Sequence, residues 1–264
     1  MPPRRRPERQ NGLVSRCCPR CGGELQPPDL MDSRWRCEDC GPVSPLHCAL
    51  SNTAEVLADV RERVRSVDGR VPLWCPWPMP AGWTIAGVAW AGDERTGPRA
   101  TALAMTGPSP ISPGPAEIVF VAEEPGIGLG TGLAGRTGAD PGSCLDPWPT
   151  NPYGRGSPHS QERPAGRLAT DPAGSDATAV RVAASARLRA SGHPTPLWAI
   201  DCDDDCCTYV GEARGLWLMA IAWPAEAGYL LAEDIALTDL ADGIPTELVF
   251  GAPSRQLSPH RRRE

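Results

Sequence analysis

Residues 18–41 read CPRCGGELQPPDLMDSRWRCEDCG and contain two Cys-x-x-Cys knuckles. Fifteen residues, 22–36, separate the two knuckles, and this spacing is typical of a zinc ribbon. Two such knuckles that face each other supply four thiolates for tetrahedral zinc. We therefore predict a zinc ribbon over residues 17–50, with a structural zinc ion bound by Cys18, Cys21, Cys37 and Cys40.

The residues around the knuckles support this prediction. Gly22 and Gly41 follow the two knuckles and permit the positive φ of tight turns that direct backbone amides at the sulfurs. The intervening segment is long enough for a hairpin, with Arg34-Trp35-Arg36 as its returning strand. Four thiolate ligands leave no open coordination position, so the expected metal is structural and not catalytic.

Other uses of these cysteines stay open at this point. The four residues would also suit two disulfides or the iron of a rubredoxin-like site, and Cys17, His47 and Cys48 are close enough in sequence to compete as ligands. The charged N-terminus is not followed by the apolar stretch of a secretory signal, so we expect a cytoplasmic protein. Thiols stay reduced in the cytosol, which favours metal over disulfides.

The charge of the chain is divided between basic ends and an acidic body. All 26 basic residues are arginine, which excludes Schiff-base lysine chemistry and a lysine-dependent phosphate loop. Residues 1–20 hold six arginines and one glutamate and residues 255–264 hold four and one, so a net charge of −6 leaves −14 on residues 21–254. Such a body repels nucleic acid. We interpret residues 1–16 and 255–264 as disordered basic tails, with contact to nucleic acid or another polyanion as the alternative.

Residues 51–254 predict an α+β domain with more strand than helix. Thr53 can cap a helix to about Val67, because valines recur at helical spacing, and a second helix is expected from Asp176 to a stop at Gly192. No apolar run reaches the roughly 18 residues that cross a bilayer, so no membrane partner is expected. Short apolar runs predict strands in an antiparallel sheet at residues 83–90, 100–105, 117–122, 216–223, 229–237 and 247–250.

Two segments are interpreted as connections. Residues 138–177 are rich in Pro, Gly, Ser and Asp, which predicts a disordered insertion. Residues 130–135, GTGLAG, match GxGxxG, but the glycines and proline of residues 136–142 argue against the helix that a dinucleotide site requires. We therefore expect a flexible connection, with a phosphate-binding loop of another type as the alternative.

Tryptophan is concentrated in residues 74–83, WCPWPMPAGW. The alternating prolines predict an extended edge segment in which Trp74 and Trp77 are partly exposed. Together with Trp83, these side chains are candidates for a ligand or peptide groove, and core packing is the alternative.

Further candidates carry acid or thiol groups. Glu123 and Glu124 join the candidate binding residues, although neighbours on a strand face opposite sides and cannot form a carboxylate dyad. Cys75 is a candidate nucleophile only if a base such as His193 lies beside it. Residues 201–207, DCDDDCC, are interpreted as a solvated hairpin tip, with a second metal site as the alternative. Seven cysteines have no assigned role: Cys17, Cys48, Cys75, Cys144, Cys202, Cys206 and Cys207.

Three motifs carry a resemblance to a known family: Trp74-x-Pro76-Trp77-Pro78-x-Pro80-x-Gly82-Trp83, Val121-Ala122-Glu123-Glu124-Pro125-Gly126-x-Gly128-Leu129-Gly130, and Gly211-Glu212-Ala213-x-Gly215-Leu216-Trp217 with Trp223-Pro224. The chain resembles a family of uncharacterised actinobacterial proteins that join a short cysteine-rich metal knuckle to one domain of unknown function. The resemblance covers most of residues 18–250. It implies this architecture and no established activity.

These observations favour a zinc-ribbon protein whose main domain binds a protein partner or a small ligand without catalysis. One alternative is an enzyme with a site near Trp74, Cys75, Glu123 and Glu124. Another is a nucleic-acid-associated regulator that acts through the ribbon and the arginine-rich tail.

Overall fold

The computed structural model describes residues 13–30, 32–49, 51–65, 71–93, 95–144, 185–202 and 205–258. Most of the two predicted tails and of the predicted insertion lie outside these residues. The structure shortens all three predicted segments. In the N-terminal tail, residues 13–16 belong to a strand, and in the C-terminal tail Leu257 is buried. The first residues of the predicted insertion, 138–144, include a short 3-10 helix. None of the helices formed by the described residues is both long and apolar enough to cross a membrane.

The expected antiparallel sheet is confirmed. Eleven strands form one large sheet in the order β1-β5-β7-β8-β9-β13-β12-β11-β10-β14-β6, and a small sheet, β2-β3-β4, lies in the cysteine segment. All neighbouring pairs are antiparallel except β10 and β14. The strands are β1 (Leu13–Cys17), β2 (Leu25–Gln26), β3 (Arg36–Cys37), β4 (Gly41–Pro42), β5 (Leu46–Ala49), β6 (Trp74–Pro76), β7 (Thr84–Asp93), β8 (Gly97–Pro108), β9 (Pro115–Glu123), β10 (Ala186–Ala190), β11 (His193–Ile200), β12 (Cys207–Ala213), β13 (Leu216–Trp223) and β14 (Ala236–Asp239).

Helices are few, as expected. They are α1 (Ala54–Arg65), α2 (Leu129–Leu133) and the 3-10 helices η1 (Pro141–Cys144) and η2 (Ala225–Ala232). α1 confirms the first predicted helix, because the Val56 N–H donates to Thr53 Oγ1 at 3.4 Å and Val56, Val60 and Val64 are buried.

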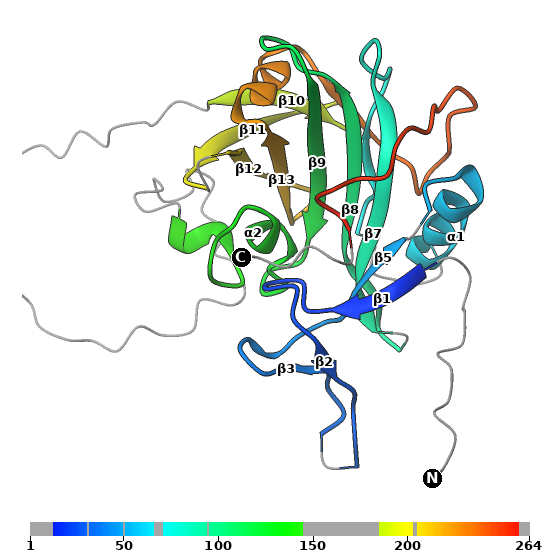
Figure 1. The fold of residues 1–264 in the computed structure, drawn as a ribbon, viewed down its shortest axis with the longest axis vertical. Helices are drawn as coiled ribbons and strands as arrows, with labels where there is room; N and C mark the ends of the chain where they lie inside the picture. The colour runs from blue at the N-terminus through cyan, green and yellow to red at the C-terminus, as the bar shows by residue number, and fades with distance from the viewer. Residues whose placement is uncertain are drawn as a thin grey trace, which may run out of the picture.

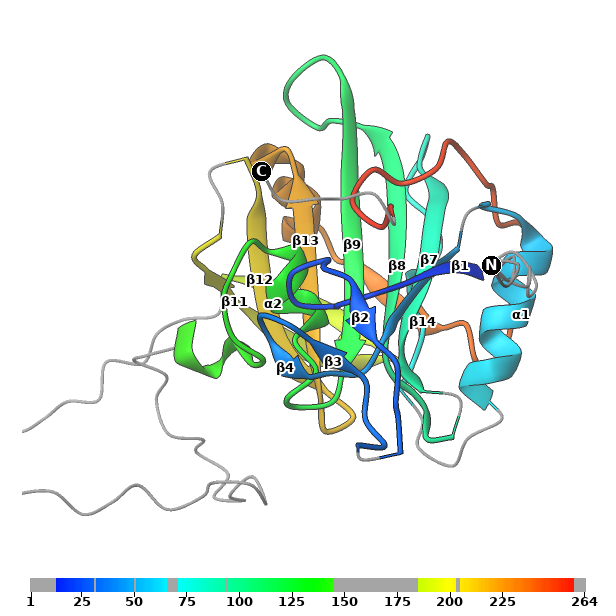
Figure 2. The same ribbon diagram turned by 60° about the horizontal axis from the view of Figure 1, so that its bottom comes forward.

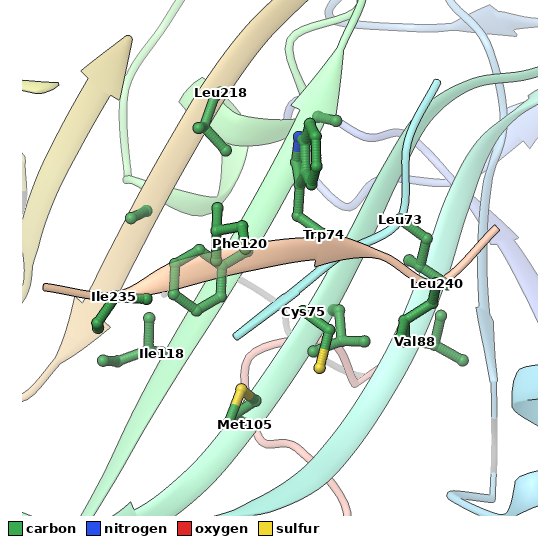
Figure 3. Packing of buried hydrophobic residues seen from close by; sticks show 14 of the residues in the cluster. Leu73, Trp74, Cys75, Val88, Met105, Ile118, Phe120, Leu218, Ile235 and Leu240 are labelled. Atoms are coloured by element: carbon green, nitrogen blue, oxygen red, sulfur yellow. The ribbon is translucent and has the colours of Figure 1, made fainter. Parts of the chain in front are cut away.

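The middle strands β7, β8, β9 and β13 are buried on both faces, and the two faces differ in side-chain size. One face, here called the aromatic face, carries large side chains such as Trp90, Leu103, Phe120 and Leu218. α1 covers one part of it, and the far end of the sheet folds over the rest, so that β6 contacts β8 and β9 (Figure 1). Figure 3 shows the crossing ribbons with Trp74, Phe120 and Leu218 gathered between them.

The opposite face, here called the alanine face, carries small side chains on β7 and β8, and larger ones such as Val121 and Met219 on β9 and β13. The small residues are Ala86, Ala89, Ala91, Ala100, Ala102 and Ala104. It is covered by segments with little regular structure. These are α2, the cysteine segment and residues 251–258 (Figure 2). Small side chains allow such segments to approach the strands closely, so this face positions the candidate site.

Three predicted elements were wrong in part. Residues 186–190 form β10 and not the end of a second helix, since Leu188 is buried between exposed Arg187 and Arg189 with a two-residue period. The earlier part of that predicted helix lies outside the described residues. Residues 229–232 belong to η2, and only residues 236–239 form a strand there. In residues 247–250, Phe250 forms an isolated bridge with Ile85.

Candidate metal centre

The four predicted ligands lie together at the small sheet. Their sulfur atoms are all within 4.8 Å of one another, and the Cys21 and Cys37 sulfurs are 3.5 Å apart. Tetrahedral zinc with Zn–S bonds of about 2.3 Å requires sulfurs roughly 3.8 Å apart, so the cluster fits this metal. Among the described residues it is the one group of three or more Cys, His, Asp or Glu side chains with this compactness.

The local backbone explains how the knuckles form. In the first knuckle the Cys18 N–H donates to the Gly23 carbonyl at 2.8 Å, and the Gly23 N–H donates to the Cys21 sulfur at 3.4 Å. Gly22 and Gly41 have φ values of 73° and 72°, as the turn prediction required. β3 begins at Arg36, inside the predicted returning segment, and pairs with β2 and β4.

The protonation of the thiols is linked to metal binding. Burial raises the pKa of the Cys18 thiol and raises that of Cys40 to about 11. A bound metal therefore has to displace protons from these two thiols. This exchange makes the affinity of the site depend on pH.

The cysteines and histidine named as possible competitors lie beside the cluster and outside it. The thiols of Cys17 and Cys48 hydrogen-bond to each other, between adjacent strands β1 and β5. His47 is buried, and its Nε2 lies 3.1 Å from the Gly92 carbonyl oxygen. The compact ligand set is thus the four cysteines of the two knuckles.

The first knuckle is anchored to the large sheet by Arg20. The Arg20 guanidinium donates to the carbonyls of Ile127 at 3.1 Å and Gly126 at 2.6 Å, in the loop between β9 and α2. A third bond at 3.4 Å reaches the carbonyl of Cys40 in the second knuckle. One side chain therefore joins both knuckles to the loop over the alanine face.

The GxGxxG segment is the surface that receives this knuckle. A Cβ on Gly132 would lie 2.2 Å from the Pro19 carbonyl oxygen, and a Cβ on Gly130 would lie 2.2 Å from the Met219 sulfur. Both glycines allow close packing, one against the knuckle and the other against β13. The expected flexible connection was wrong, because residues 129–133 form the buried helix α2.

Glu123 stabilises the same helix by hydrogen bonds to its first backbone N–H groups. Its side chain is 0% exposed, and Oε2 accepts the backbone N–H groups of Leu129 at 2.7 Å and Gly130 at 3.3 Å. Oε1 is buried and has no hydrogen-bond partner among the described residues. Burial raises the pKa of this carboxyl to about 7, against the effect of the two amides, and the nearby Asp140 carboxylate raises it further.

The other candidate residues do not share this site. Trp74 and Cys75 are buried on the aromatic face, so the predicted exposure of Trp74 was wrong. Trp83 is buried against Gly107, and Trp77 is half-buried. Glu124 follows the last residue of β9, is half-buried and forms an ion pair with Arg99 at 2.7 Å.

Neither thiol candidate outside the ribbon has the surroundings of a catalytic centre. Burial raises the pKa of Cys75 to about 12, which is the reverse of nucleophile activation, and His193 is exposed. β11 and β12 enclose the predicted hairpin tip, where the Cys202 thiol donates to the Cys206 carbonyl at 2.8 Å. The side chain of Cys144 lies outside the described residues.

Comparison with known proteins assigns a family. A family model described as "Family of unknown function (DUF6758)" matches residues 13–154 and 162–257. The chain belongs to DUF6758. This confirms the expected combination of a four-cysteine cluster with a domain of unknown function, and the predicted taxon stays a prediction. No curated protein and no solved structure matches the chain.

Proposed function

We propose that this DUF6758 member is a cytoplasmic protein in which a structural zinc ion fixes the ribbon on the alanine face, and in which the main domain binds a protein partner or a small ligand without catalysis. The observation that carries the proposal is the closed set of four thiols whose first knuckle packs on α2 through Gly132 and Arg20. A four-thiolate zinc ion offers no open position to water or substrate. Its role is therefore to hold the shape of the binding domain.

The binding half of the proposal is supported by two clefts. One of about 220 Å³ lies between residues 51–52 and residues 253–258, and another of about 150 Å³ lies between the ribbon and β7. The first combines apolar walls with a few polar groups, which is the usual composition of ligand sites, whereas the second is lined mainly by charged and polar side chains. The larger cleft is bordered by residues 253–258, which cover the alanine face, and the smaller cleft is bordered by the ribbon itself.

The proposed enzyme site near Trp74, Cys75, Glu123 and Glu124 has less support. These side chains are divided between the aromatic face, the alanine face and the surface. The nucleic-acid alternative rests on arginines of the two chain ends, most of which lie outside the described residues. Salt-dependent binding to DNA or RNA would favour that alternative.

The metal content of the purified protein tests the proposal. We expect one zinc ion per chain, measured by inductively coupled plasma mass spectrometry, and its loss in the double variant Cys18→Ser/Cys37→Ser. Cys202→Ser is the matched control, because Cys202 lies outside the cluster. Iron in place of zinc, or full zinc in the double variant, would contradict the metal half.

Partner binding tests the other half. Proteins co-purified from native lysate with the parent chain should be absent with the zinc-free variant and retained with Cys202→Ser. Equal recovery with all three would contradict the proposed dependence of binding on the ribbon.

A further inference from the structure

The hairpin of β11 and β12 carries two cysteines close to its tip. β11 ends at Ile200 and β12 begins at Cys207, and the register pair nearest the tip joins Ile200 to Thr208. Two further steps along this register bring Cys202 opposite Cys206. Opposite residues of an antiparallel pair have Cα atoms about 4.5–5.5 Å apart, and a disulfide bond spans Cα distances of about 4.4–6.8 Å. The backbone of the hairpin therefore suits a disulfide between these two cysteines.

Side-chain contacts bring the two thiols together. The Cys202 thiol donates to the Cys206 carbonyl oxygen at 2.8 Å. Burial raises the pKa of the Cys206 thiol, and a hydrogen bond with the Cys202 thiol raises it further. Both side chains pack in the apolar cluster of the alanine face, and both cysteines are free thiols. The two sulfurs thus lie on the same side of the sheet and in contact with each other.

The neighbouring Cys207 faces the other side. Adjacent residues of a strand point to opposite faces of the sheet, and Cys207 packs against the cluster of the aromatic face. A Cβ on Gly228 would lie 2.2 Å from the Cys207 sulfur, so this thiol is confined between β12 and η2. The geometry therefore makes Cys206, and not Cys207, the partner of Cys202.

The two thiols of the pair differ in their access to solvent. Cys206 is 6% exposed, whereas Cys202 is half-buried. An external reagent is attacked by a thiolate that it can reach, so the reaction starts at Cys202. The loop that a link would close is short, because only residues 203–205 separate the two cysteines. Closure of a short loop constrains the unfolded chain little, so the link should add little stability and be readily reduced.

We propose that Cys202 and Cys206 form a reversible disulfide by exchange with a low-molecular-weight disulfide of the glutathione type. The Cys202 sulfur attacks one sulfur of the reagent, the S–S bond of the reagent breaks, and one reagent thiol leaves with the proton of Cys202. Cys206 then attacks the Cys202 sulfur in this mixed disulfide, and the second reagent thiol leaves with the proton of Cys206. Two protein thiols are oxidised, and one reagent disulfide is reduced to two thiols.

This inference goes beyond the proposed function, because it concerns neither the ribbon nor a bound ligand. Oxidation would replace the hydrogen bond from the Cys202 thiol to the Cys206 carbonyl by a covalent link across the hairpin. The hairpin tip would then have two states, one for each oxidation state of the pair.

Oxidation of the full, zinc-loaded chain in glutathione buffers tests the inference. The oxidised fraction of glutathione is raised stepwise, free thiols are blocked with N-ethylmaleimide, and the products are mapped by mass spectrometry. Cleavage before aspartate separates Cys202 from Cys206, because residues 203–205 are aspartates. We expect two peptides joined by a disulfide between these cysteines, and their separation by dithiothreitol.

Single variants separate the two steps of the exchange. Cys206→Ser should stop at a mixed disulfide of glutathione with Cys202, because the second thiol is missing. Cys202→Ser should react with glutathione at Cys206 roughly tenfold more slowly than the parent reacts, since Cys206 is buried and its pKa is raised. Cys207→Ser is the matched control, and it should form the same link as the parent.

The linked peptides of the parent chain decide the inference even if a variant fails to fold. Their absence at every oxidised fraction, or a link from Cys202 to Cys207, would overturn it. A second zinc ion per chain that is lost in Cys206→Ser would also overturn it, because the pair would then be metal ligands. Zinc is measured in the same samples. A chain without zinc contradicts the metal proposal alone, because the linked peptides still decide this inference.

Discussion

The two faces of the central strands are both buried, but different interactions cover them. On the aromatic face, large side chains such as Trp74, Phe120 and Leu218 fill the space under α1 and the folded-over end of the sheet. On the alanine face, the alanines of β7 and β8 meet irregular segments that bring a smaller set of apolar side chains, such as Leu129, Leu133 and Leu257. Both faces bury apolar area, and the second face combines it with specific polar contacts.

Those contacts occur at both ends of β9 on the alanine face. At one end Glu123 accepts two amides of α2, and Arg20 connects the knuckle to the loop before it. At the other end the Glu117 carboxylate accepts the Ser254 hydroxyl and the backbone N–H groups of Arg255 and Gln256. The loops that cover this face are thus held by the four-cysteine cluster, through Arg20, and by buried carboxylates.

Removal of the metal should have the largest effect and should separate the two faces. Structural zinc contributes on the order of 10 kcal/mol to the folding of small modules, so Cys18→Ser/Cys37→Ser should release the cover of the alanine face. Hydrogen exchange should become fast in residues 126–134 and change little in β14. Cys202→Ser is the control, and unchanged protection of residues 126–134 in the double variant would contradict the role given to the metal.

A methyl group at the contact between knuckle and helix should have the next largest effect. Gly132→Ala places a Cβ 2.2 Å from the Pro19 carbonyl oxygen and should cost about 3 kcal/mol, because the knuckle must move. Gly142→Ala is the matched control, since nothing lies within 4 Å of its Cβ position. Urea unfolding measures both variants. Equal stability of the two would show that the knuckle is not packed on α2.

Glu123 should make the stability of the alanine face depend on pH. Its pKa is about 7 in the folded chain against a usual 4.5, so the unfolded chain releases this proton first. The contribution of Glu123 to the free energy of unfolding is therefore most favourable below pH 4.5, and it is lost as the pH rises from 4.5 through 7. Glu123→Gln, which resembles the protonated acid, should gain about 2 kcal/mol over the parent between pH 5 and pH 8.

Free energies of unfolding from pH 5 to 8 measure this difference. Exposed Glu212→Gln on β12 serves as the control. A constant difference between Glu123→Gln and the parent across this range would exclude a buried, protonated Glu123.

The four-cysteine cluster could be predicted from sequence because its cysteines and turn glycines are local and their spacing is typical of a zinc ribbon. Strands such as β9 could be predicted because β-branched and aromatic residues form a short continuous apolar run. The prediction of a second helix was wrong over residues 186–190, because alanines at residues 184, 186 and 190 fit both helical and strand periods.

The contact between Arg20 and residues 126–127 could not be predicted from the sequence. Arg20 donates to backbone carbonyls, which any residue provides, and these lie more than one hundred positions away. The glycines of α2 were ambiguous for a similar reason. Glycine permits a flexible link, a phosphate loop or close packing, and only the tertiary fold selects among them.

Glu124 gives the smallest expected effect and the closest comparison with Glu123. The two glutamates are neighbours in sequence, yet Glu124 forms a surface ion pair with Arg99 whose side chains are 34% and 41% exposed. Exposed pairs contribute roughly 0.2–1 kcal/mol and are screened by salt, so Glu124→Gln should cost less than about 1 kcal/mol and less still in 1 M NaCl. A cost as large as that of a buried carboxylate, or one that is insensitive to salt, would mean that Glu124 also fastens the cover of the alanine face.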